Sequence, residues 1–182
     1  MILYILFAIL GIILVWIIVA YNSFISLVNQ TKNAWADIDV QLKRRASLIP
    51  NLVEIVKGYA KHEKGVFEEV TKARSAMIGA QNPTEAAKAN DSLTGALKSL
   101  FAVAEAYPDL KASENFSKLQ DELTQTEDNI EQSRRFYNAN VRDLNTKIEV
   151  FPYNILANIF GFKAQAFFEA TDSEKADVAV TL

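Results

Sequence analysis

The sequence has no cysteine and a single histidine, His62, among its 182 residues. The absence of cysteine excludes disulfides, thiolate metal sites and a cysteine nucleophile. One histidine cannot supply the paired Glu-x-x-His motifs of a di-iron bundle or the two histidines of a zinc-protease helix. The chain also lacks a phosphate-cradling glycine loop and a Gly-x-Ser-x-Gly nucleophile elbow. We therefore expect no enzymatic activity, no bound metal and no cofactor.

The numbers of positively and negatively charged side chains are nearly equal. The chain has 19 Lys and Arg against 22 Asp and Glu, which gives a net charge of −3. Both signs are mixed along the sequence, whereas a nucleic-acid-binding protein would show a basic face or stripe. We therefore expect no nucleic-acid partner.

The first 31 residues have no charged side chain. The opening run, MILYILFAILGIILVWIIVA, is apolar throughout, and about 20 such residues in a helix span the roughly 30 Å of a bilayer core. Tyr4 near one end, and Trp16 and Tyr21 near the other, fit an aromatic belt at the two membrane–water interfaces. The run also lacks the basic start and small-residue cleavage site of a signal peptide. The sequence predicts a transmembrane anchor over residues 1–22, in contact with membrane lipid.

Charge also predicts the orientation of this anchor. Only the α-amino group precedes it, whereas Lys32, Lys43, Arg44 and Arg45 follow it. The positive-inside rule then favours an N-terminus outside and a cytoplasmic C-terminal domain. Residues 23–32 have none of the Gly/Ser- or Pro-rich character of a flexible linker, so we expect a helical connection there.

Proline and glycine are scarce, at four and six residues. After the anchor, apolar residues recur every seven positions, with a companion column three residues later in each heptad. This pattern predicts one kinked helix from about Asn33 to Gly79. The alternative is two helices that meet at residues 48–50, with Pro50 in the first turn of the second. The two columns are Trp35, Leu42, Ile49, Val56, Glu63, Val70 and Met77, and Ile38, Arg45, Leu52, Tyr59, Val66 and Ala73.

Two further helices follow. Thr84 is the predicted N-cap of a helix over residues 85–106. Ser113 is the predicted N-cap of another helix, which ends before Pro152. The segment after Pro152 is expected to form a short helix that caps the end of the bundle. The last long helix has its own heptad column: Phe116, Leu123, Ile130, Tyr137, Leu144 and Phe151.

The predicted fold class is therefore all-α. An N-terminal transmembrane helix leads into an elongated antiparallel bundle of three to four long helices plus a short C-terminal helix. The bundle is expected to cover residues 33–169. Residues 170–182 have no periodicity and are expected to form a mobile tail.

Two charged residues fall on the inward columns of the first long helix. A charge on a packed column is costly unless it is paired. For Arg45 we predict an internal pair with Asp or Glu from another helix, which would fix the register. For Glu63 we favour a position at a widened edge of the bundle that reaches water, over a pair with Arg134 or Lys147.

Three polar residues interrupt the companion column of the last long helix. They are Thr126, Ser133 and Asn140. We favour local hydrogen bonding within a column that drifts around the helix. The alternative is a polar channel that binds a ligand in the bundle core.

The C-terminal region is rich in phenylalanine. We favour packing at the end of the bundle for these rings, because buried aromatics dominate protein cores. The alternative is contact with the membrane interface or with another subunit. The rings are Phe160, Phe162, Phe167 and Phe168.

A long run from Asn33, NAWADIDVQLKRRASLIPNLVEIVKGYAKHE, resembles the core motif of the LemA family of bacterial membrane-anchored proteins. One departure is Leu144-Asn145, where the family pattern has Tyr-Asn. The resemblance implies a helical bundle on a single membrane helix in the bacterial inner membrane, with no assigned reaction and links to membrane proteostasis and membrane organisation. It continues through Tyr107-Pro108-Asp109-Leu110-Lys111-Ala112, Phe116, LQDELTQTED from Leu119, Tyr137-Asn138, Phe151-Pro152, Gly161-Phe162 and Phe167-Phe168-Glu169.

Together these features predict a membrane-tethered helical scaffold or adaptor that is not an enzyme. It would act through contacts with protein partners and with copies of itself, since copies anchored in one membrane gain effective concentration. The alternative is a ligand-sensing or signalling module that uses the polar column of the bundle core.

Overall fold

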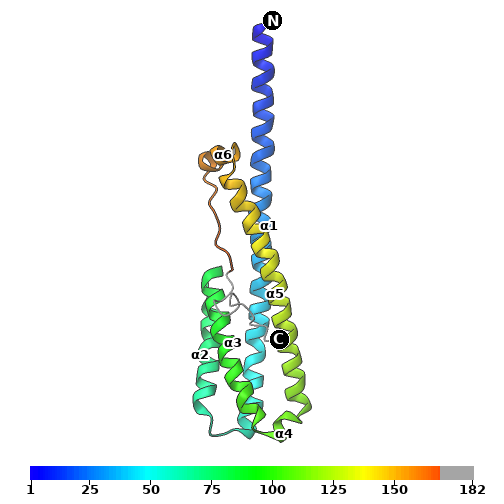
Figure 1. Ribbon diagram of the computed structural model, residues 1–182, viewed down its shortest axis with the longest axis vertical. Helices are drawn as coiled ribbons and strands as arrows, with labels where there is room; N and C mark the ends of the chain where they lie inside the picture. Colours follow the sequence, from blue (N-terminus) through cyan, green and yellow to red (C-terminus); the bar gives the residue numbers. More distant parts are fainter. Residues whose placement is uncertain (169–182) are drawn as a thin grey trace, which may run out of the picture.

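A single helix, α1 (Ile2–Tyr59), runs the whole length of the molecule (Figure 1). Its 58 residues make it about 87 Å long at 1.5 Å per residue. The computed structural model describes residues 1–168, which form helices and no strand. The all-α prediction is therefore confirmed. The other helices are α2 (Lys64–Gly79), α3 (Pro83–Glu105), α4 (Pro108–Lys111), α5 (Glu114–Glu149) and α6 (Tyr153–Phe160).

The four long helices alternate in direction, as the predicted antiparallel bundle requires (Figure 1). α1 packs mainly against α5, and α2 packs mainly against α3. The single-turn helix α4 lies at the end of the bundle farthest from the N-terminus, and α6 lies at the opposite end (Figure 1). The N-terminal part of α1 stands clear of the bundle. It belongs to the one helix within residues 1–168 that is long and apolar enough to cross a membrane.

Helix α1 continues through Pro50, so the predicted alternative of two helices meeting at residues 48–50 is wrong. Proline has no N–H, and the carbonyl of Ala46, four residues earlier, therefore loses its helical donor. The Nε of Arg74 on α2 donates to this carbonyl at 2.8 Å. Arg74 thus satisfies the backbone group that Pro50 leaves open, and the helix continues past it.

A double-mutant cycle can test whether the Arg74 side chain replaces the backbone donor that Pro50 lacks. We expect Arg74→Met to lower the free energy of unfolding by about 1–2 kcal/mol, because it leaves the Ala46 carbonyl without a donor. In the Pro50→Ala background the restored N–H takes that carbonyl, and the same change should cost less. Denaturant unfolding of the four proteins measures both costs. Equal costs in the two backgrounds would show that Arg74 does not compensate for Pro50.

The first long helix ends at Tyr59 and does not reach Gly79, which corrects our first interpretation of the heptad columns. Residues 60–63 form a turn, and α2 then runs back along α1 (Figure 1). The chain reverses here because the apolar side chains of α2 are buried against α1 and α3. The buried residues of α2 are Phe67, Val70, Ala73 and Met77.

Buried apolar residues form two clusters. The larger cluster runs through the bundle and includes Ile38, Leu52, Leu93, Leu100 and Val141 among its fully buried members. The smaller cluster lies at the end nearest the N-terminus, where α1, α5 and α6 meet. It consists of Ala20, Phe24, Leu144, Leu156 and Ala157.

The start of α3 differs in detail from the prediction. The N-cap of α3 is Asn82, not Thr84, because Pro83 takes the first helical position. The Asn82 side chain accepts from the Glu85 N–H at 2.9 Å, and the Glu85 carboxylate accepts from the Gln81 N–H at 3.0 Å. This second hydrogen bond is the main cause that lowers the pKa of Glu85.

The C-terminal end of the described chain includes the expected short helix, α6. It ends at Gly161, whose φ of 74° is left-handed and therefore suits glycine. Residues 161–168 then return along the bundle without helical structure. The predicted mobile tail, residues 170–182, lies outside the described residues.

Candidate functional site

Arg45 lies in the middle of the bundle and connects three helices. Its side chain on α1 is 5% exposed and forms an ion pair of 2.7 Å between Nη1 and Oε2 of Glu127 on α5. Nη1 also donates to the side-chain oxygen of Asn90, and Nη2 donates to the hydroxyl of Thr94 at 3.1 Å, both on α3. The structure thus gives Arg45 an acidic partner from another helix, which is the kind of pair that the sequence favoured.

Burial has the largest effect on the pKa of Arg45. Removal from water lowers the pKa of Arg45, and the nearby carboxylates of Glu127 and Asp91 oppose this shift. Arginine stays protonated because its pKa in water is so high. The site therefore holds a permanent positive charge whose partners come from two other helices, and it fixes how these helices align.

The other candidate polar residues do not converge on a cavity. Glu63 is half-buried at the N-cap of α2, beside the exposed His62, as expected for a residue at the edge of the bundle. The Thr126 hydroxyl donates to the Glu122 carbonyl at 2.7 Å, and the Asn140 amide donates to the Phe136 carbonyl at 2.9 Å. Both side chains are therefore occupied by their own helix. Ser133 is half-buried on the same helix, two turns beyond Thr126.

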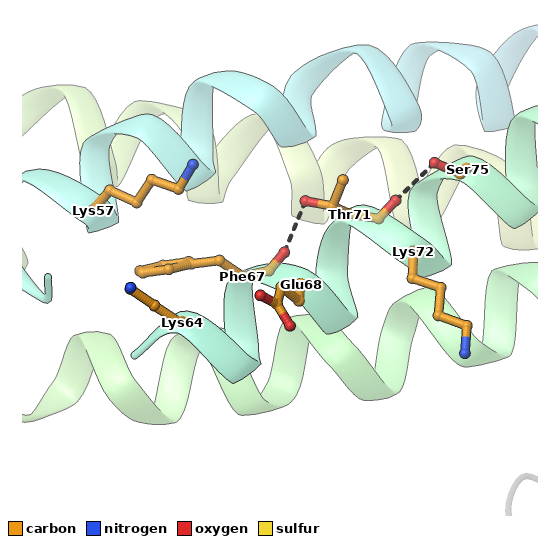
Figure 2. Close-up of a pocket in the computed structure, with 7 residues that line it drawn as sticks. All are labelled: Lys57, Lys64, Phe67, Glu68, Thr71, Lys72 and Ser75. Atoms are coloured by element: carbon orange, nitrogen blue, oxygen red, sulfur yellow. Dashed lines mark hydrogen bonds between the residues drawn. The ribbon is translucent and has the colours of Figure 1, made fainter. Parts of the chain in front are cut away.

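Residues 1–168 contain no group of three or more His, Cys, Asp or Glu side chains that could hold a metal ion. They do contain a basic groove of about 490 Å³ between the end of α1 and the first half of α2. Figure 2 shows Lys57 and Lys64 on either side of the Phe67 ring, with the Lys57 ammonium 5.8 Å from the ring centre. Glu68, Thr71, Lys72 and Ser75 complete the lining. This groove lies at the end of the bundle farthest from the N-terminus.

Aromatic rings gather at the opposite end, where α6 crosses α1. The rings of Trp16 and Tyr153 are 5.7 Å apart, and those of Tyr21 and Phe160 are 4.9 Å apart. Two members of the predicted aromatic belt therefore pack against α6. Tyr4, the third member, is 80% exposed near the free end of α1.

Phe24 is the centre of this cluster. Its ring stacks on Phe162 at 4.6 Å between centroids and meets Tyr153 edge-on at 6.2 Å. The Lys147 ammonium lies 5.3 Å from the Phe24 ring and 4.8 Å from the Tyr153 ring, and it donates to the Ser23 hydroxyl. Burial lowers the pKa of Lys147. The last turns of α5 and all of α6 are thereby joined to α1 close to its apolar segment.

The returning segment, residues 161–168, is held to α5 by asparagine side chains. Asn145 donates to the Gln165 carbonyl at 3.0 Å and accepts from the Gln165 N–H at 2.9 Å. Asn138 makes the same pair of hydrogen bonds with the backbone of Phe168, both at 2.9 Å. Between them the Tyr137 hydroxyl donates to the Ala166 carbonyl at 2.8 Å.

The spacing of the two asparagines explains how a helix can hold an extended chain. Seven residues along a helix advance about 10.5 Å, and three residues of extended chain advance about 10 Å. Asn138 and Asn145 are seven apart, and their partners Gln165 and Phe168 are three apart. From the sequence, Tyr137-Asn138 and Leu144-Asn145 were identified only as positions in the family pattern, and this role was not predicted.

The asparagine pairs predict a specific loss of order. In Asn138→Ala/Asn145→Ala we expect residues 161–168 to detach from α5, because four hydrogen bonds worth about 1 kcal/mol each are removed. Hydrogen–deuterium exchange of the Gln165 and Phe168 amides should become much faster. As a control, Asn33→Ala changes an exposed asparagine on α1 and should leave this exchange unchanged. Unchanged protection in the double variant would mean that packing alone holds the segment.

Phe167 and Phe168 have different environments in this segment. Phe168 is buried, with its ring 6.4 Å from that of Trp35 on α1, whereas Phe167 is exposed. Phe160 is also largely exposed, although one edge contacts Tyr21. Phe168 thus packs in the larger cluster and Phe162 packs on Phe24 at the bundle end, whereas Phe160 and Phe167 remain accessible.

Comparison with known proteins gives a consistent family. A profile of the LemA family matches residues 34–182. Protein LemA of Metamycoplasma hominis is 31% identical over 154 residues, which cover 82% of this chain and 69% of that protein.

Two magnetosome proteins are also similar. Magnetosome protein MamQ 2 of Paramagnetospirillum magneticum is 26% identical, over 84% of this chain and 66% of that protein. Magnetosome protein MamQ of Magnetospirillum gryphiswaldense is 25% identical, over 84% of this chain and 65% of that protein. The chain spans about two thirds of the length of these relatives, and none of them has an enzyme name. On the strength of the family profile and the 31% identity, this chain belongs to the LemA family.

Proposed function

We propose that this chain is a membrane-anchored helical scaffold that acts through protein contacts, including contacts with copies of itself. The observation that carries the proposal is the continuity of α1, which joins the apolar N-terminal segment to the far end of the bundle without a flexible linker. A surface built on such a helix is presented at a fixed distance from the membrane. The bacterial inner membrane, with the N-terminus outside and the bundle in the cytoplasm, is the proposed location.

The basic groove at the far end of the bundle is the surface we assign to protein partners. Lys57, Lys64 and Lys72 line it together with the largely buried Phe67. A positive rim around an aromatic side chain suits an acidic segment of a partner that carries an apolar side chain. The alternative of a ligand sensor in the bundle core has less support, because Thr126 and Asn140 bond to their own helix.

In-membrane crosslinking in the native host tests this function. A photo-crosslinking residue at position 68 or 72, in the groove, should capture protein partners or further copies of the chain. The same residue at the exposed position 142 on α5 is the matched control and should capture fewer. Recovery of monomers alone from all three positions would contradict the scaffold.

Topology can be tested separately because the chain has no cysteine of its own. In Ile2→Cys, a membrane-impermeant maleimide added to intact cells should label the protein. In Val40→Cys it should label only after the membrane is opened. The reverse pattern would place the bundle outside.

A further inference from the structure

Helix α6 lies across α1 at the level where the apolar segment ends. The Trp16–Tyr153 and Tyr21–Phe160 ring contacts fix this level on α1. In Figure 1, α6 is the part of the bundle nearest the N-terminus. Any membrane around the apolar segment of α1 therefore meets α6 before it meets the rest of the bundle.

The part of α1 that stands clear of the bundle is short for a membrane span. Residues 2–15 are all exposed, and packing against the bundle begins at Trp16. Fourteen helical residues advance about 21 Å, whereas a bilayer core is about 30 Å thick. If the whole bundle stayed in water, about 9 Å of the core would have no apolar helix to match it. An apolar surface at the level of α6 would fill this gap on one side of the bilayer.

The outward face of α6 has the chemistry for this place. Ile155 and Ile159 lie about one turn apart on α6 and are 50% and 68% exposed, and Phe151, in the turn just before α6, is 75% exposed. Residues 150–162 contain no charged side chain. The opposite face, with Leu156 and Ala157, is buried against α1 and α5. Large apolar side chains that are exposed together on a short segment without any charge are typical of a surface that has a partner.

We propose that α6 is a lipid-binding collar: Ile155 and Ile159, together with Phe151 in the turn before it, insert into the boundary between headgroups and acyl chains. It contacts the leaflet that surrounds the C-terminal end of the α1 span. Interfacial helices lie about 5–10 Å deep in this boundary, which matches the missing length of α1. The collar rests on the proposed function, because it requires residues 2–20 to cross the membrane.

Single-cysteine fluorescence quenching tests the collar on the full-length protein, since the native chain has no cysteine. Ile155→Cys and Ile159→Cys are labelled with a polarity-sensitive dye in vesicles of phosphatidylethanolamine and phosphatidylglycerol. Spin-labelled lipids then carry the quencher at a shallow or a deep acyl position. We expect blue-shifted emission at both positions and a greater loss of fluorescence with the shallow quencher.

Two control positions make the outcomes distinct. Ile9→Cys, in the middle of the apolar segment, should be quenched more by the deep label. Val40→Cys is 59% exposed on α1, about 30 Å beyond Ala20, and should not be quenched. If Ile9 is quenched and the α6 positions are not, the collar is wrong and the anchor stands. If Ile9 is not quenched either, the proposed anchor fails. Blue-shifted but unquenched α6 positions would mean that a second copy of the chain covers this face, and would also overturn the collar.

Discussion

Arg45→Ala is expected to lower the free energy of unfolding by about 3 kcal/mol. The change removes the one group that joins Glu127 on α5 to Asn90 and Thr94 on α3. Breaking a buried pair costs about 3–5 kcal/mol. We take the lower end because the Glu127 side chain is 43% exposed and can return to water. Thermal unfolding of the full-length protein in nanodiscs measures the loss, which at this size is a fall in Tm of about 6–12 °C.

Two control variants separate the buried pair from charge in general. Lys43, two residues before Arg45, forms an exposed ion pair with Asp39, and Lys43→Ala should cost less than about 1 kcal/mol. Arg45→Lys keeps the charge but loses the planar fork that reaches α3 and α5 together, so it should still destabilise the protein. If Arg45→Lys were as stable as the native chain, the alignment of the helices would not depend on the guanidinium geometry.

Phe24→Ala is expected to lower the free energy of unfolding by about 3–5 kcal/mol, mainly at the end of the bundle next to the apolar segment of α1. Phe24 is fully buried, and it contacts Phe162, Tyr153 and Lys147. The other four buried members of the small apolar cluster, Ala20, Leu144, Leu156 and Ala157, are all aliphatic, so the change removes the ring at its centre. We therefore expect α6 to separate from α1.

Hydrogen–deuterium exchange of residues 153–160 measures this separation. A loss of about 3 kcal/mol speeds exchange by about 10²-fold, because each 1.4 kcal/mol is a factor of ten. Phe136→Ala is the matched control, since Phe136 is exposed on α5 and its loss should change stability by less than about 0.5 kcal/mol. Uniformly faster exchange across the bundle would show that the two apolar clusters unfold together.

The apolar columns predicted the buried residues best in a helix that packs mainly against one other helix, as α5 does against α1. In α5, Phe116, Leu123, Ile130 and Tyr137 are all buried in the core, as their seven-residue spacing indicated. Phe151, the last member of that column, is 75% exposed. The reason is that α5 ends at Glu149, so the helical phase no longer applies beyond it.

The turn at residues 60–63 was missed because the heptad count continues unbroken across it. Val56 and Val70 are fourteen residues apart, and both are buried although they belong to different helices. A column of sevens therefore cannot distinguish one helix from two that are joined by a short turn. The sequence did contain a signal for the turn: the charged Glu63 lies on this column, within a polar run between Gly58 and Gly65.

The candidate sites also differ in how far the sequence could predict them. Arg45 could be singled out because a charge on an apolar column needs a partner, although its partners on α3 and α5 could not be named. The contacts of α6 with α1 join residues more than 130 positions apart, and no local pattern encodes them. The paired hydrogen bonds of Asn138 and Asn145 depend on where the chain returns after Gly161, which sequence spacing does not determine.

Because α1 is unbroken, a tilt at its N-terminal end also displaces the far end of the bundle. If residues 2–20 cross the membrane as proposed, α1 extends about 58 Å beyond it from Ala20 to Tyr59, and a tilt of the span by about 10° would move the far end of the bundle by about 10 Å. Transmembrane helices tilt to match bilayer thickness, by about 20° on average. A change in lipid thickness at one end would thus become a displacement of the basic groove at the other, large enough to bring it into or out of reach of a neighbouring molecule.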